Sequence, residues 1–152
     1  MIIYNKYSRE DFVKLLNWDS DESGTINGYK MKHQTLPIFI TYDKHEDISD
    51  NTKYEDEFLS QDELKWYTRS QRKIQSPEVQ NILNHVENNV TMYIFVKKKD
   101  DDGKYFYYLG TANYIEGTEE EDIMSNGNSV VTMKLSMHQP VRDDIYRYIT
   151  SD

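Results

Sequence analysis

The segment from Trp66 to Lys73 places two adjacent aromatic residues directly before a run of hydroxyl and cationic side chains. Aromatic rings stack on nucleic-acid bases, whereas arginine, lysine, serine and threonine hold phosphates. The pattern therefore indicates a contact with DNA. The residues that we assign to the DNA backbone in this segment are Thr68, Arg69, Ser70, Arg72 and Lys73. The alternative is that Trp66 belongs to the core and that the cations form a solvated edge.

A second segment, residues 53–58, combines an aromatic ring with neighbouring carboxylates. Tyr54 is followed by Glu55 and Asp56. A ring of this kind stacks on a cytosine that has been flipped out of the duplex, and a carboxylate accepts a hydrogen bond from its exocyclic amine. The alternative is a charged loop that Tyr54 and Phe58 anchor to the core.

Catalytic patterns are weak. Glu63-Leu64-Lys65, preceded by Asp50 or Asp56, loosely matches the PD-(D/E)xK nuclease pattern, which needs two carboxylates on one metal ion and a lysine near the phosphate. An E-x-K triplet is common in charged chains, and we interpret this one as a solvated helical turn. The sequence contains no glycine-rich phosphate loop, no zinc-ligand spacing among its histidines and no nucleophile motif. We therefore predict no catalytic residue, no metal site and no cofactor.

The elements that position these segments follow from apolar periodicity and capping residues. Helices are predicted at residues 8–17, 76–87 and 141–149. Strands are predicted at residues 29–33, 36–42, 92–96, 105–114 and 129–137, with a long loop over residues 44–63 and a turn over residues 100–103. This order predicts an α+β fold, with a curved antiparallel sheet or partly open β-barrel and flanking helices.

Composition narrows the class of protein. The chain has 152 residues, a net charge of −9, no cysteine and thirteen tyrosines. This predicts one cytoplasmic domain over residues 1–152, with no disulfide and no membrane span. The negative charge argues against a general nucleic-acid binder. Acidic residues crowd residues 46–63, but residues 65–73 carry only basic charges, so a local basic face is compatible with the composition.

Several ordered motifs resemble one family. They are SREDFVKLLNW, GYKMKHQTLPIFITYDKHE, KYEDEF, LKWYTRSQRKIQSPEVQNIL, YIFVKKKDDDGKYFYYLG and PVRDDIYRYI. Together they cover nearly the whole chain. It resembles an uncharacterised-domain family at the C-terminus of SauUSI-type modification-dependent (type IV) restriction enzymes, which carry phospholipase-D-like nuclease and helicase domains. The resemblance implies an SRA-like (SRA/PUA-like) fold that flips and reads methylated cytosine.

This resemblance implies a function and favours the functional interpretation of both aromatic segments. The expected partner is double-stranded DNA containing 5-methylcytosine, with the 5-hydroxymethyl form as a second candidate, and the parent's helicase and nuclease domains are further partners. The alternatives are a protein-interaction or autoinhibitory module of the same parent and, third, the nuclease described above.

The expected pocket has aromatic walls from Tyr54, Trp66 and one of Tyr29, Tyr42 or Tyr67. One of Asp43, Glu55 or Asp56 reads the base edge, because a cytosine amine needs a fixed acceptor. Further backbone contacts are assigned to Lys30, Lys32, His33 and Lys44.

Overall fold

The computed structural model describes residues 1–42, 56–99 and 103–151. The chain order is β1 (Lys6–Tyr7), α1 (Arg9–Leu15), the 3₁₀ helix η1 (Ser20–Thr25), β2 (Thr35–Thr41), β3 (Glu57–Ser60), β4 (Glu63–Tyr67), α2 (Pro77–Leu83), β5 (Thr91–Lys97), β6 (Phe106–Tyr114), β7 (Glu120–Ile123), β8 (Ser129–Met137) and α3 (Asp143–Thr150). No helix in these ranges is long and apolar enough to cross a membrane.

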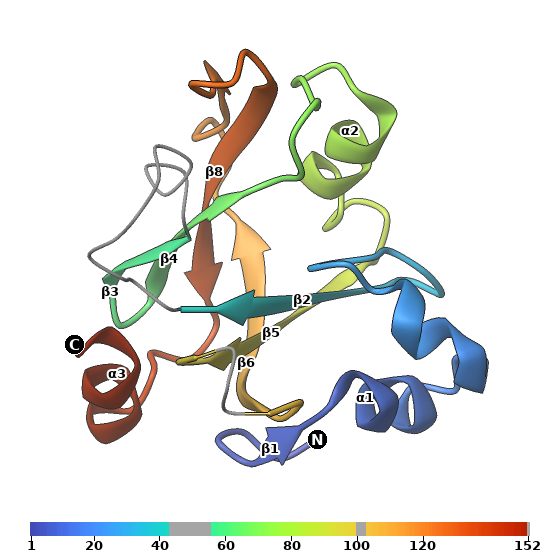
Figure 1. The fold of residues 1–152 in the computed structure, drawn as a ribbon, viewed down its shortest axis with the longest axis vertical. Coiled ribbons are helices and arrows are strands. Elements are labelled where there is room, and N and C mark those ends of the chain that lie inside the picture. The colour runs from blue at the N-terminus through green and yellow to red at the C-terminus, as the bar shows by residue number, and fades with distance from the viewer. Residues whose placement is uncertain (43–55, 100–102, 152) are drawn as a thin grey trace.

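One curved sheet contains all the described strands. Its main order is β2-β5-β6-β8-β4-β3, with β1 added to β6 and β7 added to β8 (Figure 1). Six of the seven pairings within the described residues are antiparallel, and β2 with β5 is the parallel exception. The ends of the sheet, β2 and β3, are not paired with each other, so the sheet is open. The predicted α+β class is confirmed.

Strand β6 lies between β5 and β8 and contains a β-bulge. Residues 107–112 of β6 pair with β5, whereas residues 112–114 pair with β8. A register shift lies opposite Ile94 and Phe95, and Gly110 at this point has a φ of 101°. Such a φ favours glycine, and a bulge bends a strand and increases its twist. The bulge therefore bends β6 close to the point where its pairing with β8 begins.

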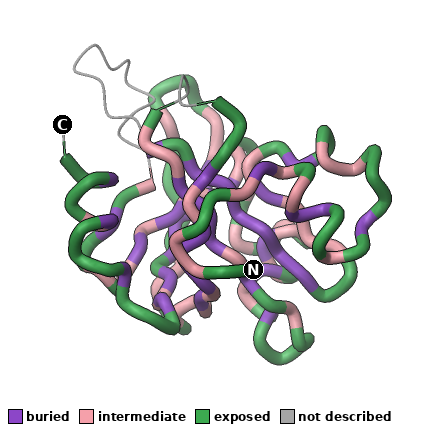
Figure 2. Tube along the Cα trace, turned by 90° about the horizontal axis from the view of Figure 1, so that it is seen from below, coloured by how far each residue is buried: buried purple, intermediate pink, exposed green. Residues whose placement is uncertain are grey.

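Strand β2 is buried on both faces, which explains its almost uninterrupted apolar sequence. Ile38 and Ile40 belong to the main core, whereas Phe39 stacks on Phe95 at 4.4 Å between ring centroids in a second, aromatic cluster. Helix α1 contributes Phe12 to that cluster. The buried residues gather in the middle of the molecule (Figure 2). Helices α2 and α3 complete the main core.

The first predicted helix is confirmed, with the expected capping box. The Ser8 hydroxyl accepts from the Asp11 N–H, and the Asp11 carboxylate accepts from the Ser8 N–H. The second predicted helix is shorter than residues 76–87 and ends at Leu83. The chain turns there so that buried His85 reaches the Val90 carbonyl and accepts from the Tyr114 N–H.

Three local predictions were wrong. Residues 57–60 form β3 within the predicted loop, and the Glu63-Leu64-Lys65 triplet lies in β4 instead of a helical turn. Pairing with β8 decides this, because alternate β4 side chains become buried. The predicted strand over residues 29–33 has only isolated bridges, and His33 and Gln34 form a turn with φ values of 52° and 59°.

Candidate nucleic-acid interface

The two faces of β4 separate the aromatic pair that the sequence places side by side. Successive strand residues point to opposite faces. Leu64 and Trp66 point into the core, whereas Lys65 and Tyr67 lie on the partly exposed face. Trp66 is 2% exposed and meets Tyr29 edge to face, with 4.9 Å between ring centroids. Trp66 is therefore a core residue, as in the alternative that the sequence left open, and offers no ring face to a base.

Lys65 and Tyr67 form the opposite, partly exposed face of β4, which we call the Tyr67 face. An Asp56 carboxylate oxygen accepts a hydrogen bond from the Tyr67 N–H at 2.9 Å. The Lys65 ammonium lies 5.6 Å from the Tyr67 ring centroid, and the side-chain hydrogen bond with Tyr67 raises the pKa of Lys65. A partly exposed ring and a cation thus share one surface, and a carboxylate is fixed to the strand backbone at the same residue.

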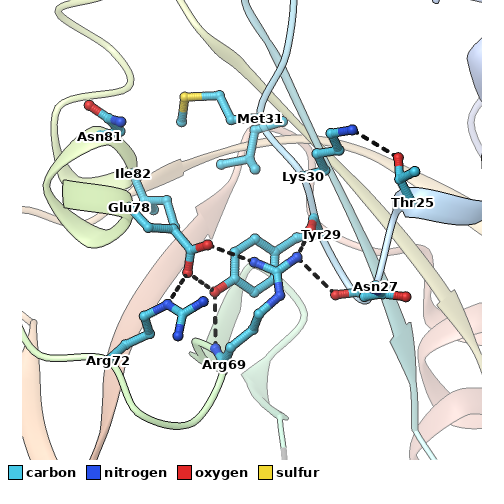
Figure 3. A pocket seen from close by; sticks show the side chains of 11 residues that line it. Thr25, Asn27, Tyr29, Lys30, Met31, Arg69, Arg72, Glu78, Asn81 and Ile82 are labelled. Atoms are coloured by element: carbon cyan, nitrogen blue, oxygen red, sulfur yellow. Dashed lines mark hydrogen bonds and ion pairs between the residues drawn. The ribbon is translucent and has the colours of Figure 1, made fainter. Parts of the chain in front are cut away.

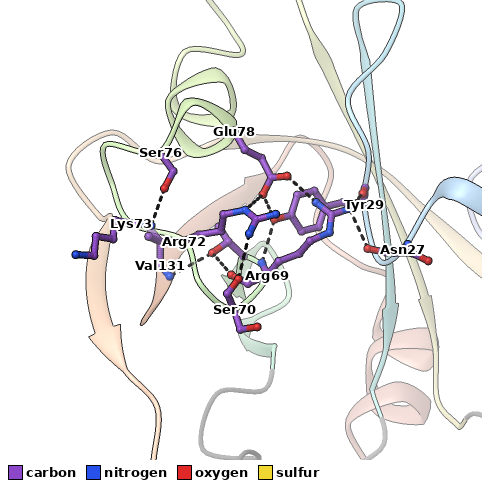
Figure 4. A network of polar contacts seen from close by, with 10 residues as sticks. Asn27, Tyr29, Arg69, Ser70, Arg72, Lys73, Ser76, Glu78 and Val131 are labelled. Atoms are coloured by element: carbon purple, nitrogen blue, oxygen red, sulfur yellow. Dashed lines mark hydrogen bonds and ion pairs between the residues drawn. The ribbon is translucent and has the colours of Figure 1, made fainter. Parts of the chain in front are cut away.

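On the core side of β4, four polar side chains form what we call the Tyr29–Glu78 cluster: Tyr29, Arg69, Arg72 and Glu78 (Figure 4). Arg69 Nη1 and Arg72 Nε bind separate oxygens of the Glu78 carboxylate, at 2.8 and 2.9 Å. The Tyr29 hydroxyl donates to Glu78 at 2.8 Å and accepts from the Arg69 N–H at 3.0 Å. The Arg69 guanidinium also lies 3.9 Å from the Tyr29 ring centroid.

These contacts hold Arg69 in place. Its Nη2 donates to the carbonyl oxygens of Asn27 and Tyr29. Arg69 is consequently a link between β4 and the segment before β2, instead of a free cation for phosphate. Burial opposes ionisation of Glu78, but hydrogen bonds from Tyr29 and Arg72 outweigh it and lower the pKa of Glu78. Burial raises the pKa of Tyr29.

A cavity of about 460 Å³ opens beside this cluster, between residues 25–31 and α2 (Figure 3). We call it the α2 cavity. Its lining residues are Thr25, Asn27, Tyr29, Lys30, Met31, Leu36, Arg69, Arg72, Glu78, Asn81 and Ile82. Of the residues predicted for base or backbone contact, it brings together Tyr29, Lys30, Arg69 and Arg72.

The remaining predicted residues are dispersed. Tyr42 is 7% exposed, and its hydroxyl accepts from the buried Phe58 N–H. Thr68 is buried too, where it accepts from the Val131 N–H.

The other predicted residues are paired, exposed or undescribed. Lys30 and Lys32 both pair with Glu22. His33, Ser70 and Lys73 are exposed. Asp43, Lys44, Tyr54 and Glu55 lie outside the described residues.

Sequence reasoning missed Glu78, Asn27 and Asn81. Glu78 could have been found only as an acidic residue in the first turn of a predicted helix, where carboxylates are common. Nothing local indicates that it neutralises two arginines that precede it in the chain. The two asparagines line the cavity from separate segments, and their sequence surroundings contain no motif.

Asp50 of the nuclease pattern lies outside the described residues, and the described residues of the pattern have other partners. Glu63 pairs with Lys134 at 3.6 Å, Lys65 interacts with Tyr67, and Asp56 binds the Tyr67 backbone. In the part of the chain that the structure describes, no three histidine, aspartate or glutamate side chains come together as a metal site.

The open sheet with its three flanking helices defines an SRA-like fold. It is similar to the SUVH5 SRA domain solved with hemi-methylated CG DNA, with a TM-score of 0.60 and 13% identity over 94% of this chain and 92% of that one. For the SUVH5 SRA domain bound to fully hydroxymethylated CG DNA, the TM-score is 0.58 and the identity 14%, over 92% and 91% of the two chains.

Arabidopsis thaliana SUVH6 in complex with SAM has a TM-score of 0.59 and 13% identity over 99% of this chain, which spans only 29% of the SUVH6 chain. The chain belongs to the DUF3427 family, a domain of unknown function, whose sequence profile matches residues 1–149. No curated protein sequence matches the chain at a significant level.

Proposed function

We propose that this chain recognises 5-methylcytosine, or its 5-hydroxymethyl form, in duplex DNA by flipping the base onto the Tyr67 face. The observation that carries the proposal is the Asp56–Tyr67 arrangement. The Asp56 carboxylate is held at the backbone N–H of Tyr67 by a hydrogen bond of 2.9 Å, and the side chain of the same Tyr67 is partly exposed. A flipped cytosine needs a ring to stack on and an acceptor for its amine.

The fold supports the choice of ligand. The SUVH5 SRA domain has been solved with hemi-methylated and with hydroxymethylated CG DNA, and it shares its architecture with nearly the whole of this chain. The sequence resemblance to the C-terminal domains of type IV restriction enzymes points to the same class of ligand. In this proposal the chain targets a parent enzyme, and the parent's helicase and nuclease domains perform the chemistry.

The free energies of base extrusion and of base binding limit how well the pocket can distinguish methylated from plain cytosine. Extruding a base costs a few kcal/mol, and stacking returns about 1–3 kcal/mol. The extra methyl group contributes only about 0.8 kcal/mol when it is buried. Sharp discrimination therefore requires that plain cytosine leave a hole in the pocket. Tyr54 as a further wall and Asp43 or Glu55 as alternative readers of the base edge lie outside the described residues and stay predictions.

The test compares Tyr67→Ala with wild type on methylated and unmodified duplexes of one sequence. We expect the variant to lose about 1–3 kcal/mol of binding to the methylated duplex and to keep its residual affinity for the unmodified one. Tyr105→Ala, which removes an exposed tyrosine elsewhere, is the matched control. A 2-aminopurine next to the modified base should brighten on binding to wild type. Equal wild-type affinity for both duplexes would refute the reader function.

Strand β7 favours a second candidate function, that of a protein-interaction or autoinhibitory module. Its four residues are all exposed, three of them are acidic, and the strand has β8 as its only partner strand among the described residues. An acidic strand of this kind suits a basic surface of the parent enzyme, as in an autoinhibitory module. Reversing the charge at Asp122 would weaken binding to the purified helicase–nuclease part under this alternative; Glu120 is left unchanged because its charge acts on Lys65 of the Tyr67 face. Under the reader function, the same variant keeps its preference for methylated DNA.

A further inference from the structure

The α2 cavity is separate from the proposed base-reading surface. Tyr29 lines the cavity and packs against Trp66, on the core side of β4. Tyr67 points to the opposite side of the same strand. Neither Tyr67 nor Asp56 lines the cavity. A ligand in the cavity would therefore not occupy the Tyr67 face.

The cavity has an apolar floor and a polar rim. Leu36 and Ile82 are fully buried, and Met31 is partly buried beside them. Asn27 and Asn81 are exposed and stand on different sides, one in the segment before β2 and the other on α2 (Figure 3). An amide side chain carries two donors and an acceptor. The floor suits a flat apolar body, and the amides suit hydrogen-bonding atoms on its edge.

The charge of the lining selects an anion. The lining carries three positive charges, on Lys30, Arg69 and Arg72, and one negative charge, on Glu78. The whole chain, in contrast, has a net charge of −9. Glu22, outside the lining, approaches Lys30 at 3.8 Å and balances part of this charge. An excess of positive charge in a hollow on an acidic protein attracts anionic ligands.

Arg72 is the residue best placed to hold the anionic group. Its Nε binds Glu78, and its Nη1 donates to the Ser70 carbonyl oxygen at 3.2 Å. Its Nη2 makes no hydrogen bond to a described residue, and the side chain is about one third exposed. The two existing bonds fix the plane of the guanidinium, while the remaining nitrogen stays available. Guanidinium groups bind phosphate strongly because their charge-assisted hydrogen bonds match its geometry.

We propose that the α2 cavity is a binding site for a nucleoside monophosphate. The base lies over Met31 and Ile82, Asn27 and Asn81 bind its edge, and Arg72 binds the phosphate. A soft thioether packs well against an aromatic ring, and asparagine pairs with base edges through its amide. The cavity volume lies within the range of small-molecule sites. The nucleotide is either free in solution or a unit of a DNA strand.

The first experiment titrates the whole chain with dAMP, dCMP and the matching nucleosides by isothermal calorimetry. We expect each monophosphate to bind at least about tenfold more tightly than its nucleoside, since a charge-assisted hydrogen bond is lost without the phosphate. Arg72→Ala should remove this difference, and Asn81→Ala should weaken nucleotide and nucleoside alike. Asn84→Ala removes a neighbouring amide outside the lining, and Lys14→Ala removes an exposed cation on α1; neither should change binding.

A melting curve for each variant separates loss of binding from loss of folding. If Arg72→Ala unfolds, Arg72→Lys keeps the charge without the fixed fork and should bind the monophosphate more weakly than wild type. Absence of nucleotide binding at millimolar concentration in folded wild type would overturn the proposal. So would binding that Arg72→Ala and Asn81→Ala both leave unchanged.

Competition with a methylated duplex distinguishes the two sources of the nucleotide. If the site takes free nucleotide, saturating DNA leaves the nucleotide affinity unchanged, and so does Tyr67→Ala. If it takes a unit of a DNA strand, the duplex displaces the nucleotide and Arg72→Ala weakens binding of that duplex. The Tyr67→Ala measurement on DNA tests the reader function independently, so failure of one proposal does not decide the other.

Discussion

Trp66 and Tyr67 are neighbours in the chain but belong to regions of opposite character. Trp66 faces the Tyr29–Glu78 cluster, where two guanidinium groups, a phenol and a carboxylate bind each other beside a packed core. Tyr67 lies on a partly exposed surface with Asp56 and Lys65. Successive side chains of a strand point to opposite faces, so two adjacent residues of β4 lie in a packed core and on a partly exposed surface.

The same comparison applies to the cations. Arg69, Arg72 and Lys73 look equivalent in a basic segment, yet Arg69 is tied to Glu78, Asn27 and Tyr29. Arg72 is partly engaged, and the Lys73 side chain is exposed. A basic segment in a sequence is therefore no measure of the positive surface in the fold. When an acidic side chain of another element binds an arginine, as Glu78 of α2 binds Arg69, the arginine links two parts of the fold.

The largest contrast is expected between Trp66→Ala and Tyr67→Ala. Removing the buried indole should lower the free energy of unfolding by about 3–5 kcal/mol, because a large cavity remains. Removing the partly exposed Tyr67 ring should change it far less. Urea denaturation of the two variants measures the difference. Similar losses in both would contradict the assignment of Trp66 to the core and of Tyr67 to the partly exposed face.

Tyr29→Phe tests the cluster without disturbing its packing. The change deletes the hydroxyl that accepts from the Arg69 N–H and donates to Glu78, so we expect a loss of about 1–3 kcal/mol in unfolding free energy. Tyr105→Phe, which alters an exposed phenol, is the control and should be neutral. Methyl-specific DNA binding should survive in Tyr29→Phe at temperatures where the protein is folded. Loss of that specificity would place Tyr29 in the reading surface.

Acid should weaken the Tyr29–Glu78 cluster. The pKa of Glu78 is lowered in the folded chain, so its ionised form stabilises the fold above its ordinary pKa. That contribution is lost as pH falls through the lowered folded pKa. Melting curves between neutral and acidic pH should show a decline that Glu78→Gln reduces. Glu87→Gln removes an exposed carboxylate beyond the end of α2, and an equal reduction there would contradict the assignment.

The smallest effect is expected from Lys73→Ala. Its exposed ammonium can contact a phosphate without being essential to the fold, so methylated and unmodified duplexes should weaken equally. The slope of log affinity against log salt should fall by about 1. Arg69→Ala should instead lower the melting temperature, with little change in the slope when the protein is folded. The reverse pattern would show that Arg69 leaves the cluster when DNA binds.

Local patterns determined much of the fold from the sequence alone. The Ser8–Asp11 capping box, the apolar strand at residues 36–42 and the strand at residues 129–137 act over a few residues, and the structure has all three elements. The α+β class followed from their order, and the SRA-like expectation followed from the motif resemblance. The Asp56 and Tyr67 candidates were also selected from their residue types.

Tertiary structure decided the remainder, because it depends on which distant segments meet. Only pairing of β4 with β8 fixes that Trp66 is buried and Tyr67 is not. Arg69 meets Tyr29, which lies 40 residues earlier in the chain, through a hydrogen bond that no local pattern encodes. The parallel pairing of β2 with β5 and the cavity beside α2 likewise join separate segments. Residue types specify the chemistry that is available, whereas burial and partner choice, set by long-range packing, decide which groups remain available to a ligand.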